Sequence, residues 1–195
     1  MSGAFRRLET VHGYPMDEVV SALQKCIRRG RADDAIWWAI EMNESGYGAY
    51  AWRRLMVIAS EDVGLADHHA PVLVNALYQM SVELYKAARA RTEGAEQKDK
   101  VRWNEESLTH AVWYLAHADK SRELCDQYAT ITQRVAKGER QEIPGWALDS
   151  HTARGRAMGR GLNFFNEEGD KLHPQKVIEG DPWGKAWEAE RSHDR

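Results

Sequence analysis

The chain has 195 residues, of which 43% are hydrophobic and 29% charged, with a formal net charge of −3. This size and composition permit a real core in one domain, with or without an appendage. The slightly acidic balance excludes a surface coated with cations for nonspecific nucleic-acid binding, so any DNA contact would be local. Apolar runs fall short of the roughly 20 residues that cross a bilayer. The N-terminus also lacks an apolar signal core, so we expect a cytoplasmic protein without a membrane span.

The first half of the chain has helical periodicity after an N-terminal extension, residues 1–13. Apolar side chains at spacings of three and four predict a helix from residue 14 to about residue 30, where Gly30 ends it. Further helices are predicted over residues 33–44 and 49–60. Pro71 then begins a long fourth helix.

The charged stretch 92–100 predicts an exposed connection. The next helix has Glu105 and Glu106 in its first turn and ends near residue 118. A last helix of this body is expected from residue 121 to residue 138. We expect its apolar stripe to point inward: Leu124, Tyr128, Ile131 and Val135. Since no segment alternates with period two, residues 14–138 are predicted to form an all-α helical bundle.

Residues 139–195 have a different character and are predicted to form a divergent C-terminal segment packed on this body. Glycine, arginine and histidine dominate residues 151–161, and a short helix is expected over residues 149–158. Residues 162–195 are predicted to form an irregular tail of coil and short turns. Aromatic side chains would anchor it: Phe164, Phe165, Trp183 and Trp187.

Cysteine usage argues against a disulfide framework and a zinc site. Cys26 and Cys125 are the two cysteines, and neither belongs to a C-x-x-C pair. We expect both to be buried thiols and expect no cofactor.

The run Ser60-Glu61-Asp62-Val63-Gly64-Leu65-Ala66-Asp67 resembles a signature of the RarA/MgsA replication-associated recombination AAA+ ATPases and their Werner-helicase-interacting relative. That signature lies in the C-terminal domain of the family. Four other segments resemble the same domain in the same order: residues 17–28, 33–38, 53–59 and 111–121. The resemblance covers about residues 14–135.

The resemblance implies a bundle similar to a clamp-loader collar domain, which forms tetramers in the family. It implies a non-catalytic oligomerisation and partner-docking role in DNA replication or recombination. The sequence contains no G-x-x-x-x-G-K-[ST] phosphate loop, so we do not expect this chain to be an enzyme. Expected partners are further copies of the chain, a separate AAA+ ATPase, a single-strand-binding protein or DNA.

Two arginine clusters are candidate nucleic-acid-binding sites: Arg28, Arg29 and Arg31, and Arg154, Arg156 and Arg160. Arginine binds phosphate through two hydrogen bonds, and neighbouring glycines allow close approach of the backbone. The alternative for the first cluster is a solvated helix end. For the second it is pairing with acidic residues of the tail: Glu167, Glu168 or Asp170. Direct nucleic-acid binding through residues 154–160 is therefore the alternative function.

The acidic run itself has two interpretations. Carboxylates beside a glycine turn usually cap backbone amides, which favours a structural motif made by Ser60, Glu61, Asp62, Gly64, Leu65 and Asp67. The weaker alternative is a metal-dependent or hydrolytic site near Glu61 and His68. The spacing of these residues is poor for either chemistry.

Overall fold

The computed structural model describes residues 8–92, 101–176, 179–180 and 182–193. In these residues the regular elements are helical, and a single bridge between Glu9 and Pro15 is the only β pairing. The predicted all-α class is therefore confirmed. The chain divides into two compact units, Met1–Gly138 (unit 1) and Glu139–Arg195 (unit 2).

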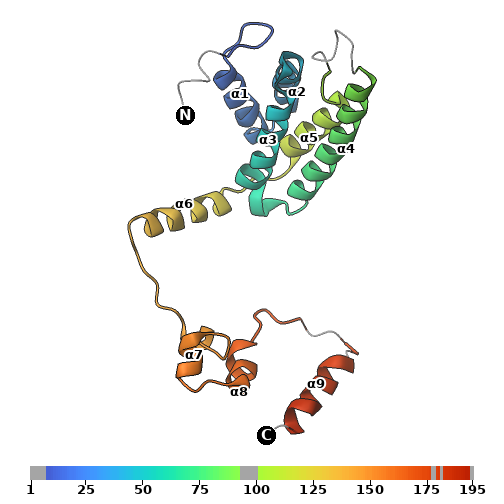
Figure 1. Cartoon of the computed structure of the whole chain (residues 1–195). Coiled ribbons are helices and arrows are strands. Elements are labelled where there is room, and N and C mark those ends of the chain that lie inside the picture. The colour runs from blue at the N-terminus through green and yellow to red at the C-terminus, as the bar shows by residue number, and fades with distance from the viewer. Residues whose placement is uncertain (1–7, 93–100, 177–178, 181, 194–195) are drawn as a thin grey trace. The chain divides into compact units, whose positions relative to one another are not determined.

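Five helices of unit 1 pack around one core (Figure 1). Their bounds are α1 Met16–Arg28, α2 Ala32–Met42, α3 Gly48–Ile58, α4 Ala70–Arg91 and α5 Glu105–His117. The centre of the core consists of fully buried side chains from these helices: Leu23, Ile27, Trp52, Leu55, Leu108 and Leu115. The predicted positions of these helices are confirmed to within a few residues, because buried apolar side chains recur in each of them at helical spacings.

Side-chain hydrogen bonds fix the start of α5 and the turn that precedes α1. Asn104 is the N-cap of α5 and accepts a hydrogen bond from the Ser107 amide at 2.8 Å. At the N-terminus, residues 8–15 form a tight turn. The His12 ring nitrogen lies 2.6 Å from the carboxylate of Glu41, which is buried in α2. The described part of the predicted N-terminal extension is thus bonded to the bundle.

The helix α6, Glu123–Ala136, differs from the other helices of unit 1 because none of its residues is buried. It extends away from the bundle (Figure 1) and contacts mainly two turns that follow α3, η3 Ala59–Val63 and η4 Gly64–Ala66. The prediction that its apolar stripe points into the core of the bundle is wrong. Amphipathic spacing identifies an apolar face but does not identify what covers it.

Unit 2 is built from short elements. They are η6 Gly145–Ala147, α7 Ala153–Ala157, α8 Leu162–Phe164, η7 Phe165–Gly169 and α9 Pro182–His193. The Thr152 hydroxyl caps α7 by accepting a hydrogen bond from the Gly155 amide at 2.9 Å. The structure adds a regular helix, α9, to the coil and turns predicted for the tail. That unit 2 packs on the bundle stays a prediction.

No helix in the described parts of the chain combines the length and the apolarity that crossing a membrane requires.

Candidate functional site

The run from Ser60 to Asp67 turns the chain at the end of α3. The wide turn η3 is followed by Gly64, whose φ of +53° suits glycine, and then by the single turn η4. A Cβ atom on Gly64 would lie 3.1 Å from the carbonyl oxygen of Ser121. The Ser121 amide donates to the carbonyl oxygen of Asp62 at 3.0 Å. The run therefore lies against the segment that leads into α6.

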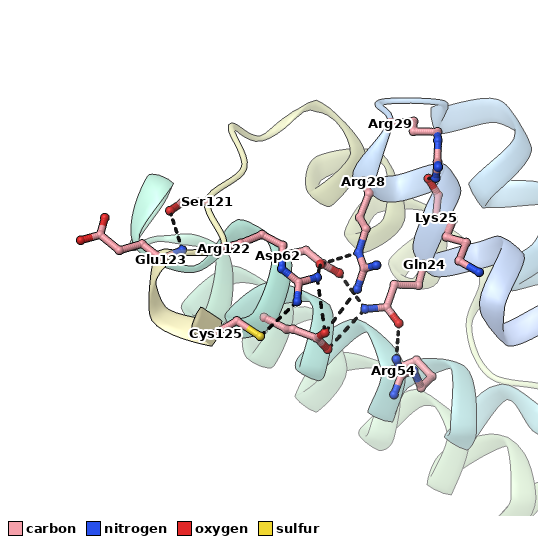
Figure 2. Close-up of polar contacts among 11 residues, drawn as sticks. Gln24, Lys25, Arg28, Arg29, Arg54, Asp62, Ser121, Arg122, Glu123 and Cys125 are labelled. Carbon is pink, nitrogen blue, oxygen red and sulfur yellow. Dashed lines mark hydrogen bonds and ion pairs between the residues drawn. The ribbon is translucent and has the colours of Figure 1, made fainter. Parts of the chain in front are cut away.

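Asp62 is the buried centre of this site, with a side chain only 1% exposed. Its carboxylate accepts hydrogen bonds from Gln24 Nε2 at 2.8 Å and from Arg28 Nε at 2.6 Å, and both donors belong to α1 (Figure 2). Arg122, directly before α6, approaches the same carboxylate at 3.5 Å. A buried carboxylate requires such partners because an unpaired buried charge is very costly.

Glu61 extends the network toward the surface. Its carboxylate lies 3.2 Å from Arg28 Nη2 and 3.7 Å from Arg122 Nη1. Arg54 of α3 donates to the side-chain carbonyl of Gln24 (Figure 2). We name these residues the charge hub: Gln24, Arg28, Arg54, Glu61, Asp62 and Arg122. The hub connects α1, α3 and η3 with the start of α6.

Asp67 closes the run with a second set of contacts. It accepts a 2.5 Å hydrogen bond from the Tyr114 hydroxyl and a 2.9 Å bond from the His69 amide. The hydrogen bond from Tyr114 makes the larger contribution and the one from His69 the smaller, and together they lower the pKa of the Asp67 carboxyl. The same bond raises the pKa of the Tyr114 hydroxyl. Asp67 thereby links the end of the turn to α5.

These contacts determine what the acidic run can do chemically. The carboxylates of Glu61, Asp62 and Asp67 already accept hydrogen bonds from arginine, glutamine, tyrosine or main-chain donors. Among the residues that the structure describes, no group of three histidine, cysteine or acidic side chains is arranged to hold a metal ion. The arrangement supports the interpretation of the run as a structural joint, a turn that holds α1, α3, α5 and the start of α6 together.

An apolar groove lies beside the charge hub. It has a volume of about 780 Å³ and is lined by α3 and η3 on one side and by the first turns of α6 on the other. Its lining residues are Met56, Val57, Ser60, Glu61, Leu124, Cys125 and Tyr128. Val57 and Tyr128 are exposed, so the groove opens to solvent.

The structure does not gather the first predicted arginine cluster into one phosphate-binding surface. Arg28 belongs to the charge hub, and Arg31 pairs with Asp34 at 2.5 Å on the surface. Arg29 donates to the carbonyl oxygen of Lys25 at the end of α1. All three side chains therefore have partners of their own.

The second cluster is divided in a similar way. Arg160 donates to the carbonyl oxygen of Leu148 at 2.9 Å and lies over the Phe164 ring, 4.2 Å from its centroid. Arg156 donates to the carbonyl oxygen of Ser150 at 3.0 Å, whereas Arg154 is exposed on α7. Main-chain carbonyl groups are thus the partners of two of these arginines.

Sequence reasoning missed Gln24 and Arg122 as members of the site. Gln24 and Arg28 lie four residues apart, which places them on one face of α1, and that spacing was the available signal. Arg122 had no such signal, because it meets Asp62 across 60 residues of sequence.

The fold and the site together define an all-α helical module whose joint is a buried charge network. A family model described as "MgsA AAA+ ATPase C terminal" matches residues 30–180, and the chain belongs to this family.

Curated relatives agree with this assignment. The chain is 30% identical over 148 residues to a protein named "ATPase WRNIP1" from Dictyostelium discoideum, covering 75% of this chain and 15% of the relative. It is 28% identical to "Replication-associated recombination protein A" of Bacillus subtilis, covering 75% of this chain and 31% of the relative. An uncharacterised AAA domain-containing protein of Mycobacterium tuberculosis is 27% identical over 184 residues, 89% of this chain and 37% of the relative. The chain thus spans well under half the length of these relatives.

Proposed function

We propose that this chain is a non-catalytic oligomerisation and docking module that acts in DNA replication or recombination. Membership of the MgsA C-terminal family and the names of the replication-associated relatives support the cellular role. The charge hub supports a structural rather than catalytic role for the acidic run, since its carboxylates are bound by arginine and glutamine.

The observation that carries the docking role is the exposure of α6. A helix with four large apolar side chains on one face and no buried residue fits a surface that another molecule covers. The partners that we propose are further copies of this chain, as a tetramer, and a separate AAA+ ATPase or a single-strand-binding protein.

Light scattering coupled to size-exclusion chromatography tests the oligomerisation role. We expect a mass of several chains at micromolar concentration, with a tetramer as the family-based expectation. A strict monomer across the micromolar range would contradict the proposal.

Affinity capture from the native host tests docking, and recovery of an AAA+ ATPase or a single-strand-binding protein is the expected result.

The alternative, direct DNA binding through Arg154, Arg156 and Arg160, has weaker support because two of these arginines bind main-chain carbonyl groups. It predicts salt-sensitive binding to forked or single-stranded DNA that disappears when all three become alanine. Unchanged binding and an unchanged salt slope would exclude it.

A further inference from the structure

Most of the apolar stripe of α6 is exposed in unit 1, and no residue of this helix is buried. Its members recur at spacings of four, three and four, which places them on one face of the helix: Leu124, Tyr128, Ile131 and Val135. Tyr128 is 69% exposed and Val135 is 68% exposed. A single helix of 14 residues is only marginally stable in water unless a face of it is packed. A surface outside unit 1 is therefore needed to cover the stripe.

The groove beside the hub continues this stripe. Leu124 and Tyr128 form one wall, and Met56 and Val57 of α3 form the other. The groove thus widens the apolar surface at the N-terminal half of α6. Its volume of about 780 Å³ is large enough for several apolar side chains of another helix.

The charges of α6 favour one orientation of a second α6 that packs against it. Two charges flank the stripe on the same side of α6: Glu123 near its start and Arg134 near its end. A second α6 in parallel would bring like charges together. An antiparallel α6 brings opposite charges together. It also places the positive end of each helix dipole beside the negative end of the other, which is favourable.

The same orientation aligns the apolar side chains. A two-fold axis between Ala129 and Thr130 places Leu124 opposite Val135 and Tyr128 opposite Ile131 of the second helix. The C-terminal half of the second helix would then cover the groove of the first. We infer that α6 is an isologous interface in which α6 of a second copy of this chain packs antiparallel over the stripe and the groove. The inference rests on the proposed oligomerisation and names the surface that produces it.

A pair of charge-adding variants of the full chain tests the surface. Ile131→Glu places a carboxylate in the stripe, and Gln133→Glu places the same group on the opposite side of the helix. In sedimentation velocity, Gln133→Glu should associate as the wild type does. Ile131→Glu should associate roughly tenfold more weakly or worse, because it buries an unpaired charge. Circular dichroism checks that both variants keep their helix content.

The outcomes separate this inference from the proposed function. Association of Ile131→Glu equal to that of the wild type would overturn the α6 interface while oligomerisation stands. A monomeric wild type would overturn both.

Engineered cysteines test the orientation in a Cys125→Ser background. Leu124→Cys combined with Val135→Cys should give a covalent dimer on mild oxidation, whereas Leu124→Cys alone should not. A covalent dimer from Leu124→Cys alone would show parallel packing and overturn the antiparallel register.

Discussion

At the scale of single residues, Asp62 determines how the joint is built. Its buried carboxylate accepts hydrogen bonds from Gln24 and Arg28 of α1, and Arg122 approaches it from the start of α6. Removal of Asp62 takes away the buried acceptor that Gln24, Arg28 and Arg122 share, and this loss is more costly than the net stabilisation provided by the intact network.

Asp62→Ala should therefore lower the free energy of unfolding by about 3–5 kcal/mol, measured by urea denaturation. The matched control is Asp34→Ala. It breaks the exposed pair with Arg31 and should cost at most about 1 kcal/mol. Equal losses in the two variants would contradict a buried role for Asp62.

Asp67 gives the joint a dependence on pH. Its pKa is lowered in the folded state by the Tyr114 hydroxyl and the His69 amide, so the folded protein binds the proton less readily than the unfolded chain. The stabilisation is complete above the ordinary aspartate pKa of about 3.9 and is lost as the pH falls through the lower folded-state pKa.

Tyr114→Phe should reduce this loss of stability on acidification, measured as unfolding free energy from pH 6 down to about pH 2. Tyr78→Phe is the control, because it removes a hydroxyl for which the described residues contain no carboxylate partner. If Tyr114→Phe leaves the unfolding free energy between pH 6 and about pH 2 unchanged, the hydrogen bond from Tyr114 does not lower the pKa of the Asp67 carboxyl.

At the scale of elements, α7 depends on one close approach. Gly155 is buried, and a Cβ atom at this position would lie 1.8 Å from the carbonyl oxygen of Asp149. This contact gives a structural reason for a glycine within the arginine-rich segment. It does not require a phosphate.

Gly155→Ala should displace α7 from residues 148–149 and speed hydrogen exchange over residues 148–160. A cost of about 1–3 kcal/mol is typical of such overpacking. Gly161→Ala is the matched control, since no atom outside its chain neighbours lies within 4 Å of its added Cβ. Similar exchange rates in the two variants would show that the contact with Asp149 does not limit α7.

The sequence predicted the helices of the bundle because α1 and α5 carry long apolar stripes that are fully buried, such as Val19, Leu23 and Ile27. It could not predict the partners within the hub, since Gln24 and Arg122 reach Asp62 across 38 and 60 residues. The position of α6 in the sequence was predicted, but the exposure of its apolar face was not. The spacing of its stripe is the same for a core helix and for an exposed interface helix.

At the scale of the whole molecule, the charge hub fixes the base of α6. The hub holds the start of α6 through Arg122 and Ser121, and the rest of the helix presents its stripe to solvent. We expect Arg122→Ala to weaken self-association without unfolding the bundle, because it loosens the base of α6 and leaves Arg28 to pair with Asp62. Sedimentation velocity together with circular dichroism checks this. Association as tight as that of the wild type would show that the hub does not orient the interface.

Hydrogen exchange of the wild-type chain at a low and a high protein concentration tests the central claim most directly. We predict that the amides of α6, Glu123–Ala136, become more protected as concentration rises, while those of α1 and α5 do not change. Protection of α6 that is independent of concentration would contradict the account, since a second copy would then not be what covers this helix.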